Sequence, residues 1–174
     1  MWKKRGDFVK LISKMSKEIL HNWEKKTAEN QKKYKQFLIK ADKNKVLKAI
    51  PEIHEDAFNK IDCLNCAACC KNYSPRFKTP DIKRIAKHLG LKEGVFIEKY
   101  LKLDEEGDYV VHSKPCPFLG SDNYCSIYEE RPSDCARFPY TDEDVILKRI
   151  PLTLKNSTFC PIVYFVLEEL VKKG

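Results

Sequence analysis

The sequence predicts a mainly α-helical protein with an irregular, loop-rich cysteine-cluster domain, α+β at most, containing one short hairpin. Three observations carry this prediction. Apolar residues recur at helical spacing in the first 60 residues, with no glycine or proline between Asp7 and Ile50. All eight cysteines lie between Cys63 and Cys160. Residues 115–140 are rich in proline and other turn-forming residues, which favours loops over regular structure there.

Charge and cysteines divide the chain near residue 60. Residues 1–60 hold 16 Lys and Arg against 8 Asp and Glu, whereas residues 61–174 hold 17 of each kind. We therefore predict a basic helical extension over residues 1–60 and a cysteine-cluster metal-binding domain over residues 61–174. Hydrophobic residues make up 43% of the chain, which is enough for a core and excludes a protein that is disordered throughout.

Three apolar stripes predict helices in the extension. The first stripe runs from residue 8 to residue 23, with Asp7 as its expected N-cap. The second covers residues 34–41 and the third residues 46–61. Pro51 lies in the third stripe and predicts either a kink or a new first turn of helix.

Short elements are expected in the cysteine domain. Thr79-Pro80-Asp81 predicts the start of a helix that Gly90 ends, and a second helix is expected around residues 95–100. A short strand is expected over residues 108–111, after a turn at Gly107. The apolar segment of residues 161–173 predicts a helix with proline at its first position.

The strongest motif is a group of four cysteines spaced as C-x-x-C-x-x-C-C, beginning at Cys63. Thiolates three residues apart can turn toward one point, as they do in zinc and iron–sulfur sites. Three ligands from this motif need at least one more from the distant cysteines. The candidate metal ligands are Cys63, Cys66, Cys69, Cys70, Cys116, Cys125, Cys135 and Cys160.

Two metals remain open for this cysteine set. The spacing of the first three cysteines is that of bacterial ferredoxins, which favours an iron–sulfur cluster of the 4Fe-4S type. Zinc is the alternative, although zinc sites usually pair two separated C-x-x-C knuckles. Eight thiols can fill two four-thiolate sites, or one site with spare thiols. A disulfide framework is disfavoured, because adjacent cysteines pair only under strain.

Charged residues beside the cysteines are candidates for contacts to the centre. Arg131 and Arg137 bracket Cys135 and are predicted to donate hydrogen bonds around an anionic thiolate site. Ordinary surface ion pairs are the competing interpretation for both arginines. His112 lies four residues before Cys116, but a solvent-facing histidine after a strand is the favoured interpretation.

Several separate blocks, in order, resemble one family. The segment from Cys63 to Cys70 resembles the signature of the CxxCxxCC zinc- or iron-chelating domain family, the YkgJ-like cysteine-cluster proteins. The helix after the cluster, the Cys116-Pro117 and Cys125 blocks, and the Arg131-Pro132-x-x-Cys135 block follow in the family's order. Cys160-Pro161 matches the family's last cysteine. The resemblance spans residues 63–161, and many members have Gly where this chain has Ala67 and Ile162.

The resemblance implies a zinc, iron or iron–sulfur centre held by these cysteines, without one settled activity. We favour a metal-binding protein with an electron-transfer or redox role. One alternative is a protein-modifying enzyme, because some relatives are flagellin lysine N-methylases; no catalytic residue is assigned. The other is a structural zinc module. The six glycines form no G-x-G-x-x-G or phosphate-binding loop, which argues against a nucleotide-type fold for a cofactor such as S-adenosylmethionine.

Location and partners follow from charge. Lysines interrupt the segment after the basic N-terminus where a signal peptide needs an apolar block, so we expect a cytoplasmic protein with no transmembrane segment. The basic extension predicts a protein or redox partner. Arg5 is its one arginine, and base readout favours arginine, so specific nucleic-acid binding is not expected. Peripheral membrane contact through the extension is a less favoured alternative.

Overall fold

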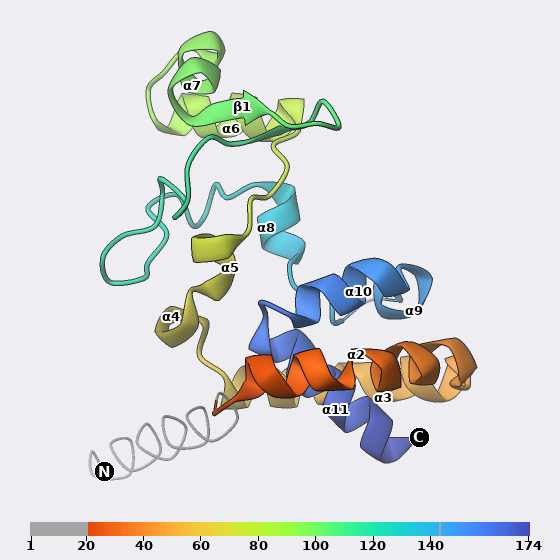
Figure 1. Cartoon of the computed structure of the whole chain (residues 1–174). Coiled ribbons are helices and arrows are strands. Elements are labelled where there is room, and N and C mark those ends of the chain that lie inside the picture. Colours follow the sequence, from red (N-terminus) through yellow and green to blue (C-terminus); the bar gives the residue numbers. More distant parts are fainter. Residues whose placement is uncertain (1–20, 143) are drawn as a thin grey trace, which may run out of the picture. The chain divides into compact units, whose positions relative to one another are not determined.

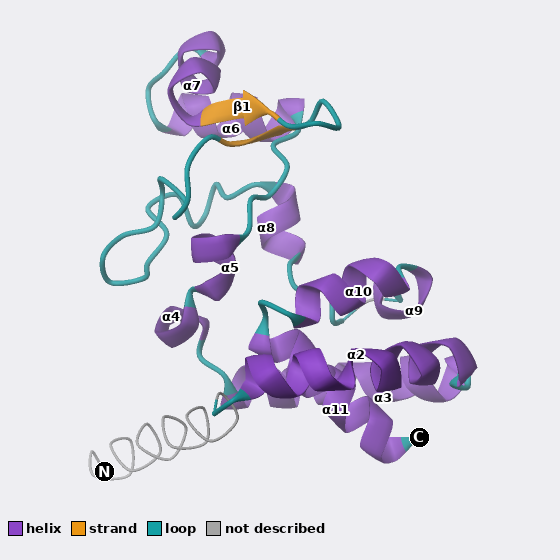
Figure 2. Cartoon of the chain, in the orientation of Figure 1, coloured by secondary structure: helices purple, strands orange, loops and turns teal. Residues whose placement is uncertain are grey.

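The computed structural model describes residues 21–142 and 144–174, and it is mainly helical with one two-stranded antiparallel sheet (Figure 2). The predicted fold class is therefore confirmed. The chain forms two compact units. The helical unit comprises the described residues up to Cys63 together with Pro139–Gly174, and the cysteine unit comprises Leu64–Phe138. The predicted helix and N-cap before residue 21 lie outside the described residues.

Two long N-terminal helices and a C-terminal helix form the centre of the helical unit (Figure 1). Helix α11 (Pro161–Lys173) packs against α2 (Trp23–Lys40) and α3 (Lys43–Lys60), while α10 (Ile150–Ser157) packs against α2 and α11. The short helix α9 (Val145–Lys148) precedes α10. The predicted domain boundary near residue 60 stays a prediction. In the structure, the C-terminal helices α9, α10 and α11 belong to the same compact unit as α2 and α3.

Local chemistry explains where α2 ends and α3 begins. The Asp42 carboxylate accepts hydrogen bonds from the backbone N–H groups of Asn44 (2.9 Å) and Lys45 (3.0 Å), and so caps α3. Pro51 lies inside α3, so the predicted new first turn at this proline is wrong. Helix α3 starts at Lys43, directly after its Asp42 cap. Its apolar face continues past Pro51 through buried Ile53 and Ala57.

The cysteine unit contains short helices and a hairpin. Helix α4 (Cys63–Cys66) begins at the unit boundary and is followed by α5 (Ala68–Asn72), α6 (Thr79–His88) and α7 (Glu93–Tyr100). Strands β1 (Leu101–Leu103) and β2 (Tyr109–Val111) pair with Leu101 opposite Val111. Helix α8 (Ser133–Arg137) closes the unit.

Side chains from α6, α7, the hairpin, the loop after it and the segment before α6 form the buried core of the cysteine unit. Its members are Phe77, Ile82, Ile85, Ala86, Phe96, Leu101, Val111, Phe118 and Ile127. Two of the candidate ligands, Cys116 and Cys125, pack against this cluster. Each lies two residues before a core member, so the core fixes the segments that carry these thiols.

Several predicted elements are confirmed. Helix α6 begins at Thr79, and Gly90 follows it with a left-handed φ of 67°. Helix α7, strand β2 and helix α11 lie where the sequence predicts them. The hairpin was predicted without the position of β1, and the short helices α4, α5, α8, α9 and α10 were not predicted. Within the described residues no single helix is long and apolar enough to cross a membrane, although the pair α10 and α11, bent by 117°, passes that test together.

Candidate metal centre

Four thiols of the cysteine unit lie close enough to interact electrostatically. They come from α5, from α8 and from the long loop between β2 and α8. Burial raises the pKa of the three thiols outside α5, and the charge of an ionised Cys70 raises all three further. We call these side chains the thiol quartet: Cys70, Cys116, Cys125 and Cys135.

The loop that carries Cys116 and Cys125 is held by backbone hydrogen bonds. Gly120 N–H donates to the carbonyl of Tyr124 (2.7 Å), and Ser126 N–H donates to the carbonyl of Phe118 (2.8 Å). An isolated antiparallel bridge joins Leu119 to Cys125. The two cysteines thus lie at opposite ends of one tight turn whose flanks are anchored in the core.

Both sulfur atoms of this turn accept a backbone N–H two residues ahead. The N–H of Phe118 bonds to Cys116, and the N–H of Ile127 bonds to Cys125. Each bond lowers the pKa of its thiol, but burial is the larger effect and raises the pKa of Cys116 to about 11. A buried sulfur that already holds an N–H donor is prepared to carry negative charge once a cation compensates it.

Cys70 is tied to the same turn from the other side. The N–H of Cys116 donates to the carbonyl of Cys70 at 2.8 Å, which joins α5 to the loop. The Cys69 and Cys70 sulfurs are 3.9 Å apart. The hydrogen bond from Cys69 lowers the pKa of Cys70 to about 7, against the effect of burial and with help from the charge of Lys71. Cys70 is therefore the thiol of the quartet that ionises most readily.

Cys135 is positioned by a buried acid that the sequence analysis did not single out. The Asp81 side chain on α6 is almost fully buried, and its carboxylate accepts the N–H and the hydroxyl of Ser133, both at 3.1 Å. The same carboxylate accepts Lys78 N–H (3.2 Å) and Arg84 Nη2 (2.9 Å). Asp81 thus ties the first turns of α6 and α8 together, and α8 carries Cys135.

These donors stabilise the negative charge of Asp81. Burial raises the pKa of this carboxyl group, but the hydrogen bonds from Arg84, Ser133 and Lys78 outweigh burial and keep the pKa below its usual value. A neighbouring buried acid, Asp134, pairs with Arg76 Nε at 3.0 Å and Lys78 Nζ at 3.2 Å. The start of α8 is therefore anchored through two carboxylates.

Arg131 lies beside the quartet. Its guanidinium stacks on the Tyr128 ring at 3.9 Å from the centroid, and its charge lowers the pKa of Cys125. Arg137 ends α8 on an exposed position, and a contact from it to the centre stays a prediction. His112 Nε2 lies 2.7 Å from the Lys99 carbonyl, an ordinary structural contact.

The remaining candidate ligands occupy different surroundings. Cys66 and Cys69 belong to the cysteine unit and are half-buried, whereas exposed Cys63 and buried Cys160 belong to the helical unit. Ligation by any of the eight cysteines stays a prediction. Across residues 21–142 and 144–174, no three cysteine, histidine or acidic side chains already form a metal-binding group. The quartet is a set of neighbouring donors, not a closed coordination shell.

The donor set defines the chemistry that fits this site. Four thiols, two of them with N–H donors, and an arginine beside them suit a soft or borderline cation, and zinc and iron are the usual metals of all-thiolate sites. The raised pKa values of Cys116, Cys125 and Cys135 mean that these three thiols stay protonated near neutral pH in the absence of such a cation. A metal would replace those protons and neutralise the mutual repulsion of the thiolates.

Comparison with known families agrees with this donor set. The family model described as "CxxCxxCC: Putative zinc- or iron-chelating domain" matches residues 62–161. The matched segment is more than half of the chain and includes the whole thiol quartet. Comparisons with curated proteins and with solved structures returned no match.

Proposed function

We propose, from the premise that this chain belongs to the CxxCxxCC zinc- or iron-chelating domain family, that it holds an iron–sulfur cluster for electron transfer or redox sensing. The cluster would be of the 4Fe-4S type, and its ligands would be the thiol quartet. The observation that carries the proposal is that four thiols from three segments of one unit, Cys70, Cys116, Cys125 and Cys135, interact electrostatically, while Cys116 N–H bonds to the Cys70 carbonyl at 2.8 Å.

Two features favour a cluster held by the thiol quartet. Backbone N–H groups bond to the sulfurs of Cys116 and Cys125, and hydrogen bonds of this kind set the reduction potential of iron–sulfur clusters. Apolar core residues adjoin both cysteines and limit the access of water. When bound, the cluster supplies one-electron chemistry, and the chain supplies its ligands, its shielding and the nearby charge of Arg131.

The second candidate is a structural zinc module. The observation that favours it is the same all-thiolate donor set with N–H bonds to sulfur, since closed four-cysteine zinc sites use these groups too. In that case the metal would have no redox function, and the quartet would serve to join α5, the loop and α8.

Metal and sulfide analysis separates the two candidates. The full chain, purified and handled without oxygen, is expected to be brown and to hold iron and acid-labile sulfide in equal amounts, about four of each per chain. The absorbance is expected to fall on reduction and to return on reoxidation. A colourless protein with one zinc per chain, and no iron after reconstitution, would contradict the iron–sulfur proposal and favour the zinc module.

A pair of neighbouring substitutions tests the ligands. Cys135→Ser removes one thiol of the quartet and is expected to abolish most of the iron and sulfide content. Ala136→Ser introduces a hydroxyl at the next, exposed position of α8 and leaves every thiol in place, so its metal content should match the wild type. Equal metal content in the two variants would exclude Cys135 as a ligand.

A further inference from the structure

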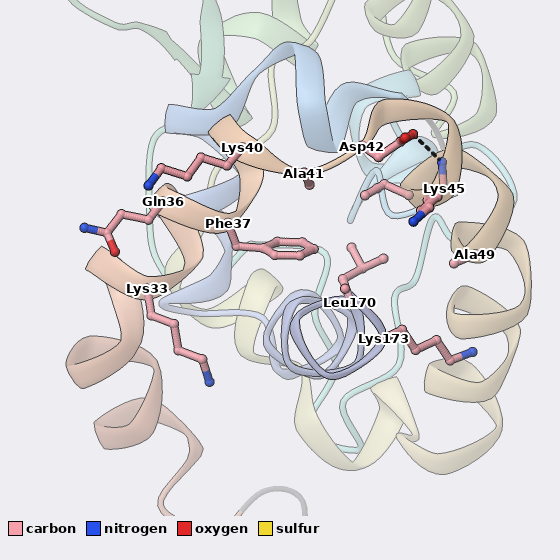
Figure 3. Close-up of a pocket in the computed structure, with 12 residues that line it drawn as sticks. Lys33, Gln36, Phe37, Lys40, Ala41, Asp42, Lys45, Ala49, Leu170 and Lys173 are labelled. Carbon is pink, nitrogen blue, oxygen red and sulfur yellow. Dashed lines mark hydrogen bonds between the residues drawn. The ribbon is translucent and has the colours of Figure 1, made fainter.

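Charged side chains meet in different ways at two places in the molecule. Around the hollow between α2, α3 and α11, the lysines point in different directions, and apolar lining residues such as Leu170 are almost fully buried (Figure 3). These charges do not act on one point. On α6, by contrast, Asp81 and Arg84 converge on one short stretch of chain, residues 130–133. This stretch lies between two cysteines of the thiol quartet.

The two charged side chains of α6 bind the peptide groups on either side of Pro132. The Nη2 group of Arg84 donates to the carbonyl of Arg131 at 3.0 Å, and the N–H of Ser133 donates to Oδ1 of Asp81 at 3.1 Å. Pro132 itself is buried and has no N–H group. One turn of α6 therefore supplies a charged donor and a charged acceptor to the backbone before and after this proline, and hydrogen bonds with a charged partner are the stronger kind.

The guanidinium of Arg84 is itself fixed on several sides. Its Nη2 also donates to Asp81 Oδ1 at 2.9 Å and lies 3.4 Å from the Glu130 carbonyl, while its Nε pairs with the Glu130 carboxylate at 3.2 Å. The next residue of α6, Ile85, is fully buried in the core of the cysteine unit. Because a guanidinium is planar and its donors point in set directions, these contacts hold residues 130 and 131 at a defined place against α6.

The stretch that Arg84 binds has no regular structure of its own. Residues 128–132 form turns and irregular backbone between Ile127, which is buried in the core, and α8, which carries Cys135. Cys125 lies two residues before Ile127, so the core fixes its segment. The place of Cys135 relative to Cys125 depends on how the chain runs between them. Metals bind ligands at narrow distances and angles, so the course of this stretch decides whether both thiols reach one metal.

We propose that Arg84 is a positioning residue of the metal centre, which holds the stretch between Cys125 and Cys135 so that both thiols face one site. This inference rests on the proposed function only in taking the thiol quartet as the ligands, and it holds for a cluster and for zinc alike. Arg84 acts through the backbone of Arg131 and Glu130. Loss of such an outer contact typically weakens metal binding by about 10- to 100-fold.

Cobalt loading of the full chain in the absence of oxygen tests the proposal. Cobalt(II) binds to the thiolate sites of other divalent metals, and its visible absorption depends on the number and the arrangement of its sulfur ligands. In Arg84→Gln we expect these absorption bands to shift and the chelator EDTA to remove cobalt about tenfold faster than from the wild type. A change in the stability of the fold alone would leave the spectrum of the loaded centre unchanged.

Two further variants separate the backbone contacts of Arg84 from its charge. Lys83→Gln removes one positive charge from the adjacent, exposed position of α6 and should match the wild type. Glu130→Gln removes the carboxylate partner of Arg84 but leaves both carbonyl groups in place, so it should speed cobalt release by less than about threefold. Release from Glu130→Gln as fast as from Arg84→Gln would overturn the proposal, because the ion pair would then be the decisive contact.

The wild-type chain separates this inference from the proposed function. If the wild type shows no sulfur-to-cobalt absorption, the thiol quartet is not a metal site and both proposals fail. If the wild type binds cobalt through sulfur, and Arg84→Gln has the same spectrum and release rate, only the role of Arg84 is overturned. Arg84→Lys keeps the charge but not the planar fork, and it is the variant to use if Arg84→Gln does not fold. Faster release from Arg84→Lys supports the proposal, and the wild-type rate overturns it.

Discussion

Removing the metal is expected to lower the free energy of unfolding of the cysteine unit by more than about 5 kcal/mol at pH 7, as it does in small structural metal sites. The physical reason is the position of the ligands. The thiol quartet joins α5, the loop after β2 and α8, and metal bonds would cross-link these segments where the unit has few other long elements. Without metal, the four thiols are separate, partly buried polar groups.

Hydrogen exchange measures this effect within one molecule. The amides of β1 and β2, and the Ser126 amide that bonds to Phe118, are expected to exchange much faster in the metal-free chain than in the metal-loaded chain. The amides of α2 and α11 in the helical unit serve as the internal control, and their exchange should change little. Restoring the metal should restore protection. Equal protection of the cysteine unit in both forms would contradict a stabilising centre.

The loading reaction has a defined pH dependence. Burial raises the pKa of Cys116 to about 11, and the pKa of Cys135 is raised as well. Both thiols therefore carry protons near neutral pH in the metal-free chain and must lose them to bind metal. We expect metal affinity to rise between pH 6 and pH 9. For each proton that metal binding releases, the affinity should rise roughly tenfold per pH unit.

Substitution of Asp81 is expected to have the second largest effect. Asp81→Asn removes a buried charge that accepts four hydrogen bonds and replaces one acceptor oxygen with an NH2 donor, so two of these bonds lose their acceptor. Breaking a buried, hydrogen-bonded charge in this way costs about 3 kcal/mol of unfolding free energy. Because Ser133 begins the helix that carries Cys135, the variant should also bind less metal.

Denaturant unfolding of metal-free protein measures the Asp81 contribution, with Glu98→Gln as the control. Glu98 is an exposed acid on α7. Its substitution removes the same charge and should change the free energy of unfolding by close to zero. The folded pKa of Asp81 is lowered, so its contribution is complete above the ordinary carboxyl pKa and disappears as the pH falls through the folded value. A variant as stable as the wild type at pH 7, or a difference that grows in acid, would contradict this role.

Local signals in the sequence were enough for several elements. Thr79-Pro80-Asp81 with Gly90 predicted α6, and Pro161 at the head of an apolar segment predicted α11. The second and third apolar stripes lie on either side of the helix break at Ala41 and Asp42, although the Asp42 cap itself was not predicted. All eight cysteines were identified as candidates from their spacing alone.

Long-range contacts account for what the sequence could not predict. The spacing does not show which motif cysteine lies next to the loop after β2, because the hydrogen bond from Cys116 N–H to the Cys70 carbonyl joins residues that are distant in the sequence. Asp81 and Ser133 are 52 residues apart in the chain, so nothing local indicates their contact. Ala67 has a left-handed φ of 46°, a conformation that favours glycine.

X-ray absorption at the edge of the bound metal shows directly whether sulfur atoms of this chain bind it. We expect a nearest shell made of sulfur alone, about four atoms near 2.3 Å, for zinc and for iron alike. Iron in a cluster would add a shell of neighbouring iron atoms. A nearest shell dominated by nitrogen or oxygen would contradict a centre built on the thiol quartet.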